Sequence, residues 1–281
     1  MTIAECLKIG NQKLAAADVA QPSREAASLL MNATRRDRAF LVAHAEYELT
    51  AAEQKLFDSH IERRQTREPF QHIVGVQEFY GLDFIVTRDV LIPRPETELL
   101  VETAIRVLAG IDSPKFCEIG VGSGCITVSV LHELPNSSAI AVDISEEVLQ
   151  IARINAVNNE VADRVEFRIS YVFTTVGTNK FHAVLSNPPY IPASDMPDLQ
   201  IEVRDFDPPI ALTDGGDGLS IVRRIIQGSP HFLLPNGYLI FEIGIGQAAE
   251  VKDMFKPAVW ENVEILNDLQ SIPRTVVARL K

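Results

Sequence analysis

The sequence predicts an α/β fold, in which a mostly parallel sheet with an antiparallel C-terminal strand follows a small N-terminal helical bundle. Residues 1–70 are rich in alanine, leucine and charged residues and show no alternating strand pattern. From Pro93 onward, short apolar runs alternate with helical segments, which is typical of strands joined by crossover helices. The length of 281 residues exceeds the usual size of one domain and favours a large core plus a smaller unit.

The first 70 residues are predicted to form a helical domain. Thr2 with Glu5, and Thr50 with Glu53, each fit a capping box, in which the threonine accepts from a free helix NH and the glutamate reaches back. Four residues after the second box are expected on one helical face: Leu56, Phe57, His60 and Ile61.

A β-hairpin within residues 71–92 is expected to link this domain to the rest of the chain. Residues 77–80 and 83–86 have the composition of two short strands, and Gly81 lies between them as a turn residue. The larger domain then covers residues 93–281.

The larger domain is predicted to contain a Rossmann-like sheet. Its parallel strands are expected over residues 116–119, 139–142, 165–169 and 181–185. Ser145 is a suitable N-cap for the helix after the second strand, and the acidic residues that follow it favour the positive helix end. Further strands are expected over residues 237–243, 259–266 and 275–280. Because the last two are separated by too few residues for a crossover helix, they are expected to pair antiparallel.

Composition excludes several classes of protein. The net charge of −12 disfavours stable nonspecific binding to nucleic acid, which depends on lysine and arginine neutralising phosphates. Cys6, Cys117 and Cys125 form no C-x-x-C pair and indicate reduced, buried thiols. The six histidines lack ligand spacing, so no metal site is expected. We expect a cytoplasmic protein without membrane attachment, because no targeting segment and no run of about 18 apolar residues is present.

A glycine loop follows the first predicted strand. It consists of Gly120, Val121, Gly122, Ser123 and Gly124, and Asp143 ends the next strand. Such a loop brings backbone NH groups close to a ligand, and an acid about 20 residues further on can bind ribose hydroxyls. The spacing is G-x-G-x-G and differs from the dinucleotide pattern G-x-G-x-x-G. The loop alone is compatible with S-adenosylmethionine or with NAD, and therefore with a methyltransferase or a dehydrogenase.

A second motif, Asn187-Pro188-Pro189-Tyr190, ends the fourth predicted strand. Each proline fixes its own φ and favours an extended conformation in the residue before it, so the Asn187 amide is held in a defined direction. Its side-chain oxygen and the carbonyl of Pro188 are acceptors that suit a planar NH2 group, and Tyr190 offers an aromatic surface on which this group can lie. The motif predicts recognition of an amide or an exocyclic amine, and it favours the methyltransferase interpretation.

Together these motifs resemble a known family. The chain is similar to the protein-(glutamine-N5) methyltransferases of peptide chain release factors, the HemK/PrmC type. The matching segments are Pro69-Phe-Gln-His-Ile-Val-Gly75, Leu91-Ile-Pro-Arg-Pro-Glu-Thr-Glu-Leu-Leu100, Ser186-Asn-Pro-Pro-Tyr-Ile191, Gly215-Gly-Asp-Gly-Leu219 and Phe241-Glu-Ile-Gly-Ile-Gly-Gln247. The Asn-Pro-Pro-Tyr motif is shared with adenine-N6 and guanine-N2 methyltransferases, whereas the Pro-Arg-Pro-Glu-Thr-Glu segment is more specific.

The resemblance implies a class I S-adenosylmethionine-dependent methyltransferase that modifies the glutamine of the Gly-Gly-Gln motif in class-1 release factors, with residues 1–70 as a docking domain. It implies that the glycine loop, Asp143, Val172 and Asn187 bind the cofactor, that Asn187, Pro188 and Tyr190 are catalytic, and that Pro189 joins them in binding substrate. The family's acid near the adenine is replaced here, within Ser170-Tyr171-Val172-Phe173, by Tyr171. The alternatives are a nucleic-acid amine methyltransferase and a noncatalytic cofactor-binding protein.

Overall fold

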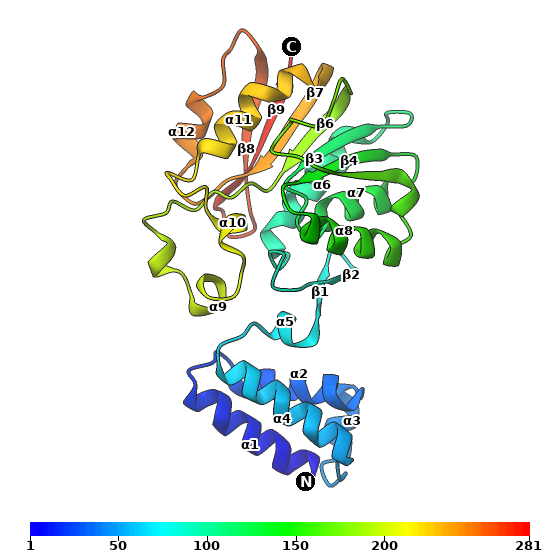
Figure 1. Cartoon of the computed structure of the whole chain (residues 1–281), viewed down its shortest axis with the longest axis vertical. Coiled ribbons are helices and arrows are strands. Elements are labelled where there is room, and N and C mark those ends of the chain that lie inside the picture. Colours follow the sequence, from blue (N-terminus) through cyan, green and yellow to red (C-terminus); the bar gives the residue numbers. More distant parts are fainter. The chain divides into compact units, whose positions relative to one another are not determined.

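The computed structural model describes residues 1–281, and the chain divides into two compact units (Figure 1). The first unit comprises Met1–Val76 together with the short segment Gln200–Phe206. The second comprises Gln77–Leu199 and Asp207–Lys281. None of the helices combines the length and the apolar character that crossing a membrane requires.

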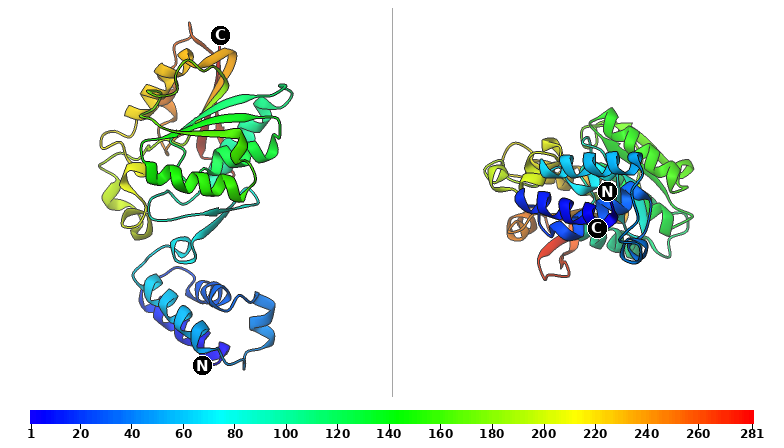
Figure 2. Two further views of the ribbon diagram at one scale, coloured as in Figure 1. Left: turned by 45° about the vertical axis from the view of Figure 1, so that its right-hand side comes forward. Right: turned by 90° about the horizontal axis from the view of Figure 1, so that it is seen from below.

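The first unit is helical (Figure 2). Both predicted capping boxes are present, with Thr2 at the start of the first helix and Thr50 at the start of the fourth. Its helices are α1 (Ile3–Ala16), α2 (Pro22–Thr34), α3 (Arg38–Ala43), α4 (Ala51–Gln65), α5 (Phe70–Val74) and α9 (Ile201–Arg204).

Three of the four α4 residues that share one helical face, Phe57, His60 and Ile61, are buried, whereas Leu56 is 43% exposed. At roughly 100° per residue, Leu56 lies at the edge of that face. The core of this unit is formed by the apolar faces of α1, α2 and α4, with Ile3, Leu14, Leu30 and Phe57 among its members.

The segment Gln200–Phe206 joins the helical unit through ion pairs. Arg67 forms a bidentate ion pair with Glu202 of α9, in which Nε donates to Oε1 at 2.8 Å and Nη2 donates to Oε2 at 2.9 Å. Arg64 Nη2 lies 3.2 Å from Glu202 Oε1. Arg64 is only 4% exposed and also pairs with Glu25 of α2. A buried charge needs such partners, so the glutamates and arginines of this cluster depend on one another.

The second unit contains a seven-stranded sheet with the order β5-β4-β3-β6-β7-β9-β8. Strands β3 to β7 are parallel, whereas β9 runs antiparallel to both of its neighbours. The predicted fold class is thereby confirmed. The strands are β3 (Lys115–Ile119), β4 (Ser138–Asp143), β5 (Val165–Ile169), β6 (Phe181–Ser186), β7 (Leu233–Glu242), β8 (Trp260–Asn267) and β9 (Pro273–Leu280).

Helices cover both faces of this sheet. Alternate residues of its central strands therefore point into two different hydrophobic cores, one on each face. Phe116 of β3 packs with Leu100 and Ile126, while the next residue, Cys117, belongs to the cluster that contains Ile225. The main helices are α6 (Glu98–Leu108), α7 (Cys125–Glu133), α8 (Glu146–Asn158), α10 (Pro209–Leu212), α11 (Ser220–Gly228) and α12 (Ala248–Asp253). The short 3-10 turns are η1 (Pro95–Thr97), η2 (Ala162–Arg164), η3 (Met196–Asp198) and η4 (Ser229–His231).

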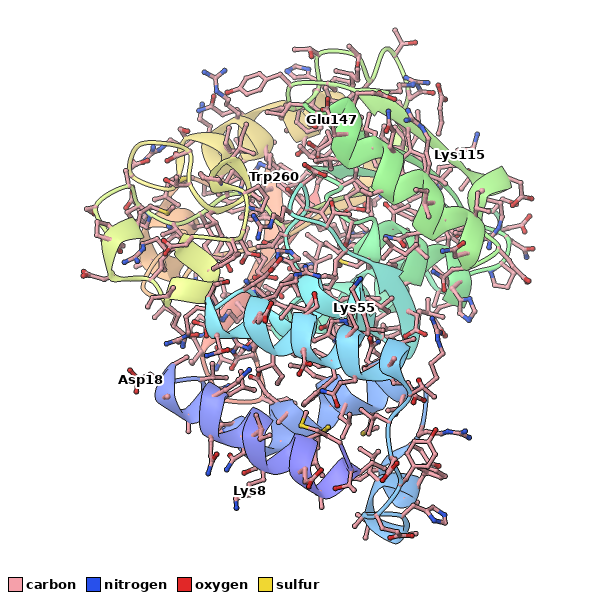
Figure 3. The ribbon with its side chains drawn as sticks, turned by 60° about the horizontal axis from the view of Figure 1, so that its bottom comes forward. Lys8, Asp18, Lys55, Lys115, Glu147 and Trp260 are labelled. Carbon is pink, nitrogen blue, oxygen red and sulfur yellow. The ribbon has the colours of Figure 1, made fainter.

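Two local predictions around the sheet are also confirmed. Ser145 caps α8 by accepting from Val148 N at 3.3 Å, and Glu147 lies in the first turn of that helix (Figure 3). A hairpin is formed by β1 (Val76–Phe79) and β2 (Leu82–Ile85). Its two turn residues, Tyr80 and Gly81, both have positive φ, as a tight two-residue hairpin turn requires.

Candidate active site

A cavity of about 320 Å³ lies within the second unit, where β3, β4, β5 and β6 reach their carboxyl ends. Open parallel sheets bind ligands at this edge. Of the residues that the sequence proposes for the site, eight line the cavity: Gly120, Val121, Gly122, Ser123, Asp143, Val172, Asn187 and Pro189. The other three, Gly124, Pro188 and Tyr190, are not in its wall. Gly124 is the N-cap of α7, and Pro188 and Tyr190 flank Pro189 in the chain.

The glycine loop has a backbone that other residues adopt poorly. Gly120 and Gly122 have φ values of +74° and +54°, and a Cβ added to either would meet no atom within 4 Å. Since both line the cavity, the missing side chains leave room for a ligand to approach the backbone closely. Gly124 has a different role, because a Cβ there would lie 3.4 Å from Ala152 of α8.

Asp143 holds this loop while facing the cavity. Its Oδ2 accepts a hydrogen bond from Gly122 N at 3.1 Å, and its Oδ1 accepts one from Ile144 N at 2.8 Å. Burial raises the pKa of Asp143, and hydrogen bonds from the backbone of Gly122, Ser145 and Ile144 oppose that rise. The carboxylate is therefore an acceptor fixed at the end of β4, between the glycine loop and the start of α8.

Glu118 was not singled out from the sequence, although it lines the same cavity. It is fully buried in β3, and its Oε2 accepts from Thr127 N at 2.9 Å and from the Thr127 hydroxyl. Its Oε1 is buried without a hydrogen-bond partner. Burial raises the pKa of Glu118 to about 8. The available signal was an acid inside an otherwise apolar strand, since buried carboxylates are rare without a partner.

The Asn187 amide is tied to residues far away in the sequence. Its Nδ2 donates to Thr97 Oγ1 at 3.2 Å, and the Thr97 hydroxyl donates to Glu242 Oε2 at 2.7 Å. The Tyr190 hydroxyl donates to Glu242 Oε1 at 2.9 Å. Sequence reasoning missed Thr97 and Glu242, although both belong to segments that carry the family resemblance.

The backbone of Tyr190 is also held from two sides. Gln247 Nε2 donates to the Tyr190 carbonyl at 2.8 Å, and the glycine turn that contains Gly218 packs against the same carbonyl. Asp214 shapes that turn by accepting from the backbone of Gly216, Gly218 and Ser220. Desolvation works against ionisation of Asp214, but these bonds outweigh it and lower its pKa to about 2. Asp214 is thus a turn-forming residue.

The segment after β5 carries no acid toward the cavity. Tyr171 takes that place and is 47% exposed, with the Arg224 guanidinium 5.4 Å from its ring centroid. The next residue, Val172, has a φ of +52°, an unusual value for a β-branched residue. Strained backbone of this kind is found preferentially at ligand sites.

Cys125 is the only cysteine that lines the cavity, and burial raises the pKa of its thiol to about 12. All three cysteines are free and buried, as predicted. No group of three histidine, cysteine, aspartate or glutamate side chains is arranged to hold a metal ion.

Comparison with known proteins defines the class first. Residues 95–204 match a family model described as the methyltransferase small domain, and residues 5–75 match the PrmC N-terminal domain. A solved methyltransferase from Pyrococcus furiosus is 15% identical, covers 72% of this chain and 90% of its own, and superimposes with a TM-score of 0.52. The fold is that of a class I methyltransferase.

Two full-length relatives then define the family. The release factor glutamine methyltransferase of Koribacter versatilis is 39% identical over 280 residues, which are 99% of each chain. That of Cereibacter sphaeroides is also 39% identical over 280 residues, 100% of this chain and 99% of the relative. The chain belongs to the release factor glutamine methyltransferase family, as its motifs predicted.

Proposed function

We propose that the protein transfers the methyl group of S-adenosylmethionine to the side-chain amide nitrogen of the glutamine in the Gly-Gly-Gln motif of class-1 release factors. The observation that carries this proposal is the Asn187 amide, held in the wall of the cavity with its oxygen free of protein donors. An acceptor in this position suits an amide NH2 group. Membership of the release factor glutamine methyltransferase family supports the choice of substrate.

The residues around the cavity fit S-adenosylmethionine. The open space above Gly120 and Gly122 accepts a ligand that has no pyrophosphate, and Asp143 is an acceptor for ribose hydroxyls. The Oε1 of Glu118 has no partner within the protein and lies in the same wall, where it is available to a polar group of the cofactor. Tyr171 and Val172 provide the wall against which the adenine would pack. When bound, S-adenosylmethionine supplies an electrophilic methyl group.

The catalytic task of the protein is to orient a weak nucleophile. The lone pair of an amide nitrogen is delocalised into its carbonyl, so alignment with the methyl group decides the rate. Asn187 Oδ1 and the Pro188 carbonyl are the acceptors proposed for the two NH hydrogens, and Tyr190 packs beside them. Fixing the nitrogen in this way contributes roughly 7–11 kcal/mol through proximity and orientation.

The helical residues 1–70 are proposed to dock the release factor, with residues 71–92 as the linker and residues 93–281 as the catalytic domain. The net charge of −12 supports a protein partner and disfavours stable binding to nucleic acid. We place the enzyme in the cytoplasm, where release factors act, without membrane attachment.

The test is a comparison of substrates with radiolabelled S-adenosylmethionine. Intact release factor, a Gly-Gly-Gln peptide, transfer RNA, ribosomal RNA and DNA are incubated in parallel, together with a release factor whose motif glutamine is replaced by asparagine. We expect label on intact release factor and none on the replaced form. Label on a nucleic acid alone would identify an exocyclic amine methyltransferase, and binding of cofactor without any transfer would identify a noncatalytic protein.

A further inference from the structure

A buried hydrogen-bond chain connects the two ends of the Asn-Pro-Pro-Tyr motif. It runs from Asn187 through Thr97 to Glu242 and back to the hydroxyl of Tyr190. Thr97 is 2% and Glu242 1% exposed. The chain joins η1, at the start of α6, to the carboxyl ends of β6 and β7. The central bond, from Thr97 to Glu242, is buried, whereas Asn187 and Tyr190 at the two ends are partly exposed.

We propose that Thr97 and Glu242 are positioning residues that determine which side of the Asn187 amide faces the substrate. This inference rests on the proposed function. The carboxylate of Glu242 offers only acceptors, and a threonine hydroxyl has a single hydrogen. Once Thr97 donates that hydrogen to Glu242, its oxygen must act as the acceptor for Asn187. The Asn187 NH2 group is therefore turned toward Thr97.

The consequence for the site is a fixed acceptor in the cavity wall. With Nδ2 occupied by Thr97, Asn187 Oδ1 accepts no hydrogen bond within the protein and remains available to the substrate. The substrate amide presents NH donors. In the opposite orientation, the NH2 group of Asn187 would face these donors and could not accept from them. An amide has nearly the same shape in both orientations, which means that packing alone does not choose between them.

The groups around Glu242 affect its pKa and therefore its role as a hydrogen-bond acceptor. Burial raises the pKa of Glu242, hydrogen bonds from Thr97 and Tyr190 and the charge of Arg274 oppose the rise, and Glu96 adds to it. Burial and the adjacent Glu242 raise the pKa of the Tyr190 phenol, so it stays a neutral donor. Thr97 and Tyr190 each donate one hydroxyl hydrogen to Glu242, one to each of its carboxyl oxygens.

The test compares Thr97→Val, which removes the hydroxyl at nearly constant shape, with Thr97→Ser, which keeps it. Binding substrate to the valine variant requires the Asn187 NH2 group to face a buried side without an acceptor. We expect kcat/KM for release factor to fall at least tenfold and S-adenosylmethionine affinity to stay within twofold of the parental value. The serine variant is expected to recover kcat/KM to within threefold. The matched control is Thr103→Val, the same change at a buried threonine on α6 outside the site, with parental kcat/KM.

Glu242→Gln tests the direction of the chain. The introduced amide can donate to Thr97, whose hydroxyl hydrogen is then free to point at Asn187 and to invert its orientation. We expect a loss of at least tenfold in kcat/KM per folded molecule with cofactor affinity retained. Should Thr97→Val not fold, Thr97→Ala takes its place.

The outcomes separate the two proposals. Parental protein that binds cofactor but transfers no methyl group to glutamine overturns the proposed function, and this inference with it. Parental transfer together with a folded Thr97→Val or Glu242→Gln variant whose kcat/KM is within twofold of parental overturns the positioning role alone. A lower melting temperature with unchanged kcat/KM would assign Thr97 a purely structural role, and it would likewise overturn the positioning role alone.

Discussion

The backbone of Gly218 packs directly against the carbonyl of Tyr190. A Cβ placed on Gly218 would lie 2.2 Å from the Tyr190 oxygen and 2.8 Å from its carbonyl carbon. Gly218 also has a φ of +77°, in the left-handed region that side chains disfavour. The glycine turn therefore fixes the position of the motif's last residue, and only glycine permits that approach.

We predict that Gly218→Ala lowers both stability and activity. The left-handed backbone alone costs about 1–2 kcal/mol with a side chain, and the contact with a carbonyl forces the motif to move. The melting temperature should fall, and kcat/KM should fall more than tenfold. Gly216→Ala is the control in the same turn, because its Cβ would meet Asp214 Oδ1 at an ordinary 3.6 Å. Equal behaviour of the two variants in calorimetry and methyl-transfer assays would contradict this role of Gly218.

Asp143→Ala should weaken S-adenosylmethionine binding by about one to two powers of ten. A hydrogen bond to a charged group contributes roughly 1.5–3 kcal/mol, and the substitution also releases Gly122 N from its acceptor. Isothermal titration calorimetry measures the change directly. Glu147→Ala removes the same charge from an exposed position in the first turn of α8 and should leave the affinity unchanged. Unaltered affinity in folded Asp143→Ala would remove this residue from the cofactor site.

The raised pKa of Glu118 predicts a stability that decreases with pH. Because burial raises this pKa to about 8, the folded protein holds the proton more tightly than the unfolded chain, whose carboxyl titrates near 4.5. The free energy of unfolding then decreases as pH rises from about 4.5 to 8. Asp207, whose pKa burial raises to about 6, adds a change of the same sign.

Glu118→Gln should therefore flatten this dependence, since glutamine does not titrate. The measurement is the melting temperature of parental protein and variant across that pH range. Glu62→Gln, at an exposed position of α4, should keep the parental slope. A parental melting temperature that rises steadily over the same range, with the variant parallel to it, would show that Glu118 is ionised in the folded protein.

The ion pairs of Glu202 predict that segment Gln200–Phe206 depends on Arg64 and Arg67. Glu202→Ala leaves the buried Arg64 with Glu25 and the Glu68 carbonyl, and it removes both hydrogen bonds from Arg67. We expect backbone amides of α9 to exchange hydrogen at least tenfold faster, because a four-residue helix has little stability of its own. Asp205→Ala removes an exposed acid that pairs with its neighbour Arg204 and should leave the exchange near the parental rate. Similar protection in both variants would mean that other contacts hold the segment.

The sequence predicted the strands well because each is a short apolar run bounded by turn residues. Strand β7 shows the limit of this reasoning. It begins at Leu233, whereas the predicted start was residue 237. Its pairing with β6 jumps from Leu233 to Tyr238, and Asn236 between them has a φ of +65°, so the turn-favouring residues 235–237 form an irregularity inside the strand.

The parts of the candidate site that the sequence could indicate are local. The glycine loop and the Asn-Pro-Pro-Tyr motif are each continuous in the chain, so their backbone constraints are visible in the residue order. Thr97 and Glu242 are 145 residues apart, and only the fold brings their side chains together. The role of each becomes apparent once its hydrogen-bond partner is known, and a single sequence does not contain that information.

Asn187→Ala should separate catalysis from folding and from cofactor binding. The change removes the proposed substrate acceptor, while Pro188 and Pro189 still restrict the backbone and Gln247 still holds the Tyr190 carbonyl. A substrate NH left without its acceptor costs about 1–3 kcal/mol, and misalignment of the weak nucleophile adds a loss on the order of 100-fold in rate. We therefore expect S-adenosylmethionine affinity close to parental and methyl transfer to release factor reduced by 100-fold or more. Asn158→Ala, at the exposed end of α8, should retain the parental rate.

Asn187→Asp is the sharper variant because it keeps an acceptor and the shape of the side chain but has no NH2 group to donate to Thr97. Partial activity, above Asn187→Ala and below the parental protein, would assign the acceptor as the essential feature and the donor as the group that orients it. Methyl transfer is measured with radiolabelled S-adenosylmethionine at saturating release factor, after circular dichroism has shown that each variant is folded. Parental rates in Asn187→Ala would mean that the Pro188 carbonyl and the packing of Tyr190 suffice to align the amide, and the proposed mechanism would be wrong even with release factor as the substrate.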